Sequence, residues 1–412
     1  MTEETKKNKV FQGNQKSSIS DTVKGSRDYT GIDALKREVI KDILVGNFRL
    51  YGFEPAETPI IEFEEFVKSG NESDEAVSDI FKLQDRGKRK LALRYEFTFQ
   101  LKRISQNKKL PYKRYQIGEI FRDEPVSSNR FRQFTQCDVD VIGSTIKDEA
   151  EILALTCNIL KELGIKAVIN INSRKLLNEI MDEQGVKEKD RMNAIKEIDK
   201  LDKLPESEIK KNLKKYNAEK LLAIIKKPEK SFEKYNSYKE IKELKDCCKI
   251  YDVPVSFQPS LARGLSYYNG SVFEIKGEMK ETIIAGGSFL VNNIQATGIS
   301  FGLERISQLA KIKTEEKRIV IIGIGQDKKA IELAESLRKK GFFCSLFFNK
   351  VSKALEYANS YSIPYVIFLG EDEAKKKELL RKTGSETVPV IFAGEKFVAG
   401  YDREKLKALL GL

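Results

Sequence analysis

The sequence predicts an α+β fold in which an antiparallel-sheet domain is interrupted by a helical insertion and followed by a separate α/β domain. Residues 113–124 and 130–143 alternate polar and apolar side chains on either side of a loop, as paired antiparallel strands do. Residues 173–250 are rich in Lys and Glu and carry little strand signal. From about residue 317, strand and helix patterns alternate, which is typical of a largely parallel sheet.

The first domain is expected to begin after a polar, mobile tail at residues 1–21. Residues 31–45 predict a helix. Residues 51–62 predict a turn and a strand, in which Pro59 restricts pairing to an edge or a bend because it lacks an N–H group. Further strands are expected at residues 266–277, 282–290 and 298–302.

One further helix is predicted to begin near Thr145, because Asp148 follows three residues later as in a capping box. It should end at Gly164. The apolar stripe on its buried face is expected to hold Ile152, Leu155, Ile159 and Leu163.

These patterns divide the chain into domains. The sheet domain is expected in two parts, residues 22–172 and 251–312, with the insertion at 173–250 between them. The second domain is expected at 317–412. Its predicted strands are 319–324, 342–348, 364–369 and 388–393, and its predicted helices are 328–340, 352–360 and 372–382.

Composition restricts the chemistry. The chain has 412 residues and a net charge of +12, which favours polyanionic partners. It contains no histidine, and this excludes a Ser-His triad, a histidine-ligated metal and an imidazole base. Its five cysteines are irregularly spaced, and its apolar runs are far shorter than the ~20 residues that cross a bilayer. We therefore expect a soluble, cytoplasmic protein with reduced thiols.

The densest chemical signal is FRDEPVSSNRFRQFTQCDVDVIG, residues 121–143. Guanidinium groups match phosphate oxygens, an aromatic face stacks on a base, and an amide with a carboxylate can hold an ammonium group. The side chains that suit a nucleotide and an amino acid in this way are Arg122, Arg130, Phe134, Gln136 and Asp140. Composition alone favours the alternative of an ordinary amphipathic strand.

This segment resembles the second signature motif of class II aminoacyl-tRNA synthetases, and GISFGLERI at 298–306 resembles the third. YGFEPAETPIIE is more loosely similar to the first, a dimer-interface strand. The resemblance implies that Arg122 binds the α-phosphate of ATP and Arg305 the γ-phosphate. It also implies that Phe134 stacks on adenine, Glu124 meets the adenine amino group and Arg130 helps to hold the bent ATP.

Two segments are similar to those of histidyl-tRNA synthetases. LARGLSYYNGSVFEI at 261–275 resembles the family signature, and LRYEFTFQLKR at 93–103 resembles its substrate-binding strand. The resemblance implies that Arg263 supplies positive charge at the α-phosphate, where a fixed guanidinium can stabilise developing charge. It places the histidine substrate among Glu96, Thr98, Gln136, Asp140, Arg263, Tyr267 and Tyr268.

In this interpretation Glu96 and the hydroxyl of Tyr268 face the two imidazole nitrogens, Thr98 lies near the amino group, and Gln136 with Asp140 holds the α-ammonium. No other proteinogenic side chain presents two ring nitrogens. A charge-assisted hydrogen bond contributes roughly 1.5–3 kcal/mol, so an unpaired carboxylate would discriminate against other substrates. Taken singly, a packed tyrosine and a surface glutamate remain alternatives for Tyr268 and Glu96.

The resemblance extends from about residue 22 to the end of the chain. KGSRDYTGIDALKR at 24–37 and INSRKLL resemble the family's amino-terminal stretch and inserted domain, and the α/β domain resembles the anticodon-binding domain of class IIa enzymes. The implied substrates are ATP, histidine and tRNA(His), with Mg²⁺ accompanying ATP. The resemblance also implies a homodimer, and it implies no membrane association.

The chain departs from the family pattern at several positions. The family's AGGRYD is AGGSFL here, so that Ser288, Phe289 and Leu290 replace Arg, Tyr and Asp, and Ser266 replaces an acid. The tightness of histidine binding is therefore in question. Thr135 and Ser173 stand where relatives often have histidine; a histidine-free synthetase could be translated while charged tRNA(His) is scarce, or the sequence was deliberately depleted of histidine.

Two rival functions follow from the same motifs. A non-charging paralogue, such as the regulatory subunit of ATP phosphoribosyltransferase in histidine biosynthesis, shares the catalytic fold but lacks the anticodon-binding domain. Synthetases for threonine, proline or glycine share the class IIa architecture. RGLSYY argues against these synthetases, and the chain lacks the histidine that threonyl enzymes use to bind zinc.

Overall fold

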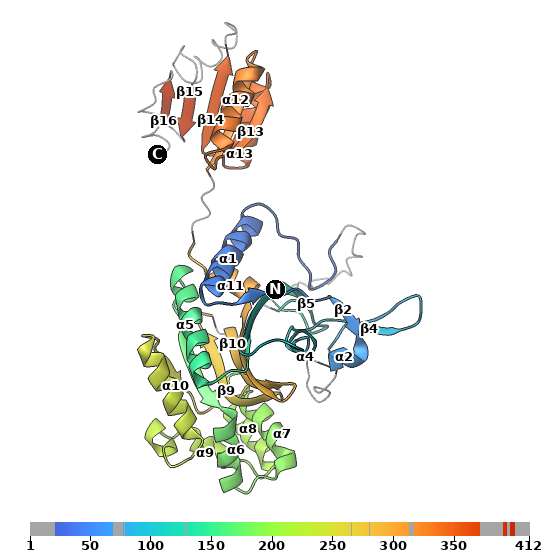
Figure 1. Cartoon of the computed structure of the whole chain (residues 1–412), viewed down its shortest axis with the longest axis vertical. Coiled ribbons are helices and arrows are strands. Elements are labelled where there is room, and N and C mark those ends of the chain that lie inside the picture. Colours follow the sequence, from blue (N-terminus) through green and yellow to red (C-terminus); the bar gives the residue numbers. More distant parts are fainter. Residues whose placement is uncertain are drawn as a thin grey trace, which may run out of the picture. The chain divides into compact units, whose positions relative to one another are not determined.

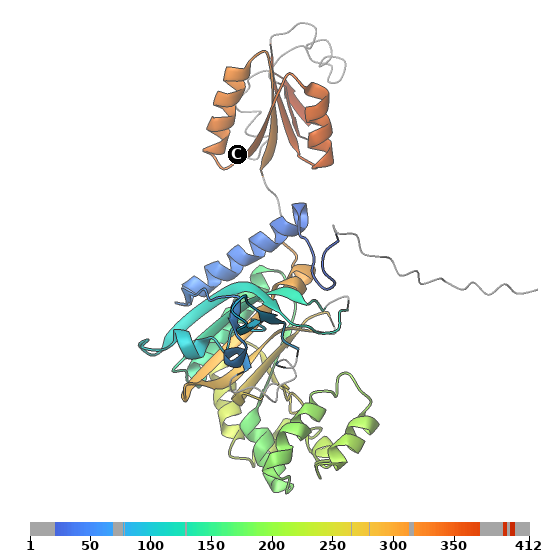
Figure 2. The same ribbon diagram turned by 90° about the vertical axis from the view of Figure 1, so that its right-hand side faces the viewer.

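The computed structural model describes residues 21–68, 77, 79–127, 130–264, 266–279, 281–312, 317–370, 390–393 and 396–399. The chain forms two compact units, Met1–Ile312 and Lys313–Leu412 (Figures 1 and 2). The division falls between the two domains that the sequence predicts, which end at residue 312 and begin at residue 317. The predicted tail lies outside the described residues except for Asp21.

An eight-stranded sheet forms the centre of the first unit. Its strands, in spatial order, are β1 (Glu54–Pro55), β5 (Tyr112–Phe121), β6 (Gln133–Ile142), β11 (Ile294–Gly302), β10 (Thr282–Val291), β9 (Tyr268–Lys276), β7 (Val168–Ser173) and β8 (Val255–Phe257). All pairs from β5 to β7 are antiparallel, and only the edge strands β1 and β8 pair in parallel. The predicted antiparallel sheet is confirmed. Strand β7 was not predicted; it lies between the predicted end of the helix at Gly164 and the start of the insertion at residue 173.

Helices cover one face of this sheet: α1 (Gly31–Leu50), α5 (Ile146–Glu162) and α11 (Leu303–Leu309). Ile40, Leu44 and Phe48 recur every four residues on α1 and are fully buried, and the Phe48 ring lies 5.8 Å from that of Phe301 on β11. The capping box of Thr145 and Asp148 and the buried stripe of α5 are both confirmed. These contacts leave the opposite face of the sheet free for polar side chains.

A small sheet, β2 (Ile61–Phe63), β4 (Lys90–Leu93) and β3 (Lys82–Gln84), lies with α2 (Glu64–Lys68) and α4 (Leu101–Ile104) beside the large one. The strand expected at 93–103 is wrong: only Leu93 is in a strand, and α4 begins at Leu101. Arg94 donates to the carbonyls of Thr58 and Glu119, and Gln100 donates to that of Pro59. These side-chain bonds hold the segment in turns.

The insertion is helical, as predicted, and comprises α6 (Arg174–Glu183), α7 (Glu188–Ile198), α8 (Glu206–Lys214), α9 (Leu221–Ile224), a 3₁₀ turn (Glu229–Phe232) and α10 (Tyr238–Ile250). Helix α10 lies along α5, as Figure 1 shows. The apolar side chains of the insertion belong to the same buried cluster as those of the sheet. The insertion is therefore packed as an extension of the core of the first unit.

The second unit contains a five-stranded sheet in the order β13 (Phe343–Phe348), β12 (Arg318–Ile324), β14 (Tyr365–Gly370), β15 (Val390–Ala393) and β16 (Lys396–Ala399), with α12 (Asp327–Arg338) and α13 (Val351–Ser360). The first three strands are parallel, but β15 and β16 are antiparallel, and β16 was not predicted. The sheet is therefore mixed. The helix expected at 372–382 lies outside the described residues.

Candidate functional site

The polar face of the large sheet collects the side chains of alternate residues. Gln136, Asp138 and Asp140 project from this face of β6, and each is less than a tenth exposed. Gly298, paired with Asp140 on β11, has no side chain because a Cβ there would lie 2.1 Å from Oδ1 of Asp140. The alternation of side chains along β6 thus gives the site a polar floor made of Gln136, Asp138 and Asp140. Beside it, Gly298 of β11 leaves the backbone uncovered by a side chain.

Four arginines from separate parts of the chain lie near one another, and the charge of one of them, Arg122, reaches Asp138 of this floor. Burial lowers the pKa of Arg305, and the charges of Arg130, Arg122 and Arg263 lower it further, against the opposing effect of Glu281. The structure therefore brings Arg122, Arg130 and Arg263 into electrostatic reach of Arg305. Concentrated positive charge of this kind is suited to a polyphosphate.

Contacts with the backbone orient two of these arginines. Nε of Arg122 donates to the carbonyl of Tyr95 at 3.0 Å, and its guanidinium lies 5.4 Å from the ring centroid of Phe134. Nη1 of Arg305 donates to the carbonyl of Thr282 at 2.5 Å. Each still has further N–H donors for a ligand.

Glu124 and Arg130 pair with each other across the hairpin loop, with Oε2 and Nε 2.5 Å apart. The Arg130 side chain is 57% exposed, so this pair can open at little cost. Arg130 can therefore turn from its carboxylate partner toward a bound anion.

Glu96 and Tyr267 form the apolar-walled end of the site. The hydroxyl of Tyr267 lies 3.5 Å from Oε2 of Glu96, and the rings of Tyr267 and Tyr268 are 4.8 Å apart. Burial raises the pKa of Tyr267 well above its usual value, and the charge of Glu96 raises it further. Burial and the charge of Glu96 raise the pKa of Tyr268 as well, so both tyrosines lie near this carboxylate. Thr98 lies in the turn that follows Glu96 and is half-buried.

Sequence reasoning missed Asp138 and Arg114. Nε2 of Gln136 donates to Asp138 and to Oγ of Ser300, while Asp140 pairs with the fully buried Arg114 at 2.7 Å. Asp138 could have been found from the sequence, because it lies midway between Gln136 and Asp140 in the period-two spacing of a strand. Arg114 has no such signal, because only the pairing of β5 with β6 places it opposite Asp140.

A second missed group joins the amino-terminal segment to the site. Arg37 on α1 pairs with Glu304 at 3.0 Å and donates to Oγ1 of Thr135, and its guanidinium lies 3.9 Å from the ring centroid of Tyr29. Glu304 in turn accepts a hydrogen bond from the backbone N–H of Thr135. This network fixes β6 against the helix that carries Arg305.

The departures at residues 288–290 lie on different sides of the sheet. Ser288 is buried and bonds to Glu149 of α5, on the helix-covered face. The Phe289 ring lies 5.7 Å from that of Tyr267, whereas Leu290 is half exposed. Only Phe289 therefore bears directly on the tyrosine pocket.

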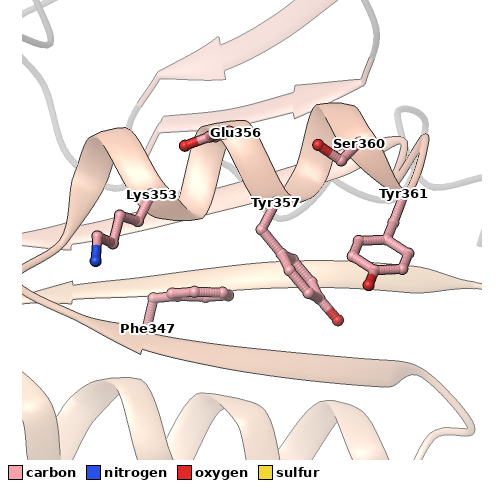
Figure 3. Close-up of a pocket in the computed structure, with 6 residues that line it drawn as sticks. All are labelled: Phe347, Lys353, Glu356, Tyr357, Ser360 and Tyr361. Atoms are coloured by element: carbon pink, nitrogen blue, oxygen red, sulfur yellow. The ribbon is translucent and has the colours of Figure 1, made fainter.

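The second unit has a groove of its own, about 600 Å³ in volume, between α13 and β13. Figure 3 shows Phe347, Tyr357 and Tyr361 along it, with Lys353 at one end. The rings of Tyr357 and Tyr361 are 4.6 Å apart, and Tyr361 is 57% exposed. Exposed rings beside a cation are the usual elements of a surface that stacks unpaired bases.

Comparison with known proteins decides the family. The family model described as histidyl-tRNA synthetase matches residues 25–306, and an anticodon binding domain matches 318–387. The chain belongs to the histidyl-tRNA synthetase family. Among relatives of this synthetase, histidine–tRNA ligase 1 of Bacillus cereus is 32% identical over 88% of this chain and 94% of its own length. Histidine–tRNA ligase of Helicobacter pylori is 32% identical over 87% and 92%.

Solved structures support the class II fold of this synthetase. Histidyl-tRNA synthetase from Nostoc sp. PCC 7120 superimposes with a TM-score of 0.77 at 22% identity, covering 96% of this chain and 99% of that one. A Bacillus halodurans protein described as an ATP phosphoribosyltransferase regulatory subunit/histidyl-tRNA synthetase gives 0.72 at 21%, covering 84% and 97%. Within the described residues of the synthetase, no helix is long and apolar enough to span a membrane.

The buried Asp140 predicts a pH dependence of stability. Burial raises its pKa from 3.8 to about 7, although Arg114 opposes this shift. Between these values the folded state retains a proton that the unfolded state has lost, so the free energy of unfolding falls as the pH rises. Asp140→Asn removes this contribution. The stability of the wild type relative to Asp140→Asn should decrease from about pH 4 to 7, measured by urea unfolding; a constant difference would contradict the shift.

Proposed function

We propose that the synthetase activates histidine with ATP and transfers it to the 3′-terminal adenosine of tRNA(His). The observation that supports this most strongly is the family match over residues 25–306, within which Arg122 and Arg263 lie in electrostatic reach of Arg305. The histidine–tRNA ligases that it resembles extend through the second unit as well.

ATP binds to the arginine cluster. Arg122 holds the α-phosphate, Arg305 the γ-phosphate, and Arg130 leaves Glu124 to hold the bent triphosphate. The released Glu124 accepts from the adenine amino group. Phe134, already beside Arg122, stacks on the base. Binding relieves the mutual repulsion of the guanidinium groups.

Mg²⁺ arrives with ATP. Among the residues that the structure describes, no three Cys, Asp or Glu side chains gather into a metal site. Phosphate oxygens and water suit Mg²⁺ as ligands, so the ion fits as part of the substrate. Its positive charge would supplement that of the arginines.

Histidine binds beside this cluster. Its imidazole lies between Glu96 and the tyrosine pair, where the carboxylate accepts from one ring nitrogen and a hydroxyl of Tyr267 or Tyr268 meets the other. Thr98, Gln136 and Asp140 surround the α-ammonium, and Asp138 adds a second carboxylate to that end. The ammonium approaches a floor that is already acidic, and this compensates for its desolvation.

The reaction needs positioning and electrostatics, with no ionisable base. The substrate carboxylate forms a bond to the α-phosphorus, and the bond to pyrophosphate breaks. Arg263 stabilises the charge that develops on the phosphoryl oxygens. In the second step the terminal adenosine hydroxyl attacks the carbonyl carbon, AMP leaves, and the adenylate phosphate accepts the proton. A chain without histidine can perform both steps.

The regulatory paralogue is less well supported. Such a protein would have no use for an anticodon-binding domain, and residues 318–387 match one. We propose that the groove of Phe347, Tyr357 and Tyr361 stacks unpaired anticodon bases, with Lys353 beside the backbone. The net charge of +12 would steer tRNA to the protein.

The synthetase is also proposed to be a homodimer. Ile61, Phe63 and Leu83 share one face of the small sheet and are 51%, 56% and 39% exposed. Leu91 lies opposite both Phe63 and Leu83 on this face. Such a continuous apolar face is typical of an oligomer interface.

Pyrophosphate exchange with each of the twenty amino acids tests the activity. Only histidine should support exchange. Glu96→Gln should reduce histidine-dependent exchange by about 10- to 100-fold, because it replaces a charge-assisted bond. Glu151→Gln, which breaks an ion pair with Lys113 on the opposite side of the sheet, is the control. Undiminished exchange in Glu96→Gln would refute the imidazole assignment.

Two variants should separate activation from tRNA binding. Arg263→Ala should lower exchange by about 10²- to 10³-fold, as loss of a preorganised donor does, and leave tRNA affinity unchanged in filter binding. Tyr361→Ala should show the reverse, with affinity reduced about 5- to 100-fold through the loss of one stacking ring. If Arg263→Ala lost tRNA affinity instead, its proposed role would be wrong.

Sedimentation tests the dimer. The wild type should sediment at twice the chain mass of 47.0 kDa, and Phe63→Ser should shift it toward the monomer, because an interface core loses a buried ring. Phe343→Ser removes a comparably exposed ring from the second unit and should leave the dimer intact. A monomeric wild type would exclude the proposed interface.

A further inference from the structure

The loop that carries Arg263 needs external support. Arg263 lies between β8 and β9 with φ at +52°, in the left-handed region that residues with a Cβ rarely adopt. Such a conformation persists only where the surrounding structure holds it. Its guanidinium is held only loosely, since Nη1 lies 3.5 Å from Oε1 of Glu274.

The support comes from the junction of β7 and α6, where the chain enters the insertion. Nη2 of Arg174, the first residue of α6, donates to the carbonyl of Arg263 itself at 2.8 Å. Nδ2 of Asn172 donates to the carbonyls of Pro259 and Leu261 at 3.0 and 2.8 Å. Both donors are at most 4% exposed. A rigid junction therefore fixes the backbone of the loop at several points.

Burial of Arg174 carries an unfavourable desolvation free energy, because a guanidinium loses its hydration on entering the core. Its Nη1 lies 3.7 Å from the sulfur of Met192 on α7, so the side chain bridges the insertion and the loop. A neutral side chain would fill this place with less loss of hydration. An apolar side chain could not donate to the carbonyl of Arg263 as Arg174 does.

Acidic groups of the insertion face the same loop. A side chain on Gly264 would lie 3.4 Å from Oδ2 of Asp199, which follows α7. Asp202 pairs with Lys276 of β9, which also lies 3.3 Å from Glu274, the partner of Arg263. The insertion therefore binds the backbone of the loop through Arg174, and the charge of its Asp199 acts on the Arg263 guanidinium.

We propose that Arg174 is a positioning residue for amino-acid activation: it holds the backbone of Arg263 so that its guanidinium meets the α-phosphate. The insertion is thereby coupled to the activation step, and displacement of α6 changes the rate of adenylate formation. This inference rests on the proposed role of Arg263.

A double-mutant cycle on the full-length chain tests it, with single-turnover adenylate formation as the measurement and active-site titration as the correction for folded fraction. Arg174→Gln should lower the rate about 10- to 100-fold in the wild-type background, as a small misplacement of a catalytic group does. The KM values for ATP and histidine should change little, because Arg263 acts mainly in the transition state. With Arg263→Ala already present, Arg174→Gln should lower the rate less than about 2-fold.

The controls distinguish the possible failures. Arg191→Gln breaks an ion pair with Asp182 elsewhere in the insertion and should leave the rate unchanged. If Arg174→Gln folds poorly, Arg174→Lys, which keeps the charge but shortens the reach, gives the same comparison. Equal rate losses in both backgrounds, or no loss in either, would overturn the positioning role. A normal rate in Arg263→Ala alone would instead overturn the proposed function of that residue.

Discussion

Mutual repulsion among guanidinium groups is the constraint on which this site depends. Burial lowers the pKa of Arg305, and the charges of Arg122, Arg130 and Arg263 lower it further, against the opposing charge of Glu281. Something other than their own contacts must hold them together. The apolar face of the large sheet, packed against α1, α5 and α11, supplies the stabilising free energy.

Backbone carbonyls take part in positioning three of these four arginines. Arg122 and Arg305 donate to carbonyls of neighbouring segments, and the carbonyl of Arg263 accepts from Arg174. Such bonds fix direction without neutralising charge, because a carbonyl carries only a partial charge. The cluster remains electropositive toward a polyphosphate. Preorganisation of this kind lowers the reorganisation required during catalysis.

The site also contains acidic side chains, which complement its arginines. Asp138 and Asp140 lie buried side by side, where burial raises the pKa of both carboxyls and Arg114 opposes the rise. An arriving ammonium would relieve this pair as ATP relieves the arginines. In the proposed binding mode the ammonium of histidine meets these carboxylates and the triphosphate of ATP meets the arginines, and this complementarity favours the correct relative orientation of the two substrates.

The sequence by itself determined the strand hairpin, the capped helix α5, the helical insertion and the family, because alternation, capping and motif spacing are local properties. Tertiary structure decided the rest. The segment 93–103 is not the predicted strand, because the side chains of Arg94 and Gln100 donate hydrogen bonds to carbonyls far away in the sequence and hold it in turns. Arg114 meets Asp140, and Arg174 meets Arg263, only through strand pairing and chain crossing, since contacts between residues 26 and 89 positions apart leave no periodic trace in sequence.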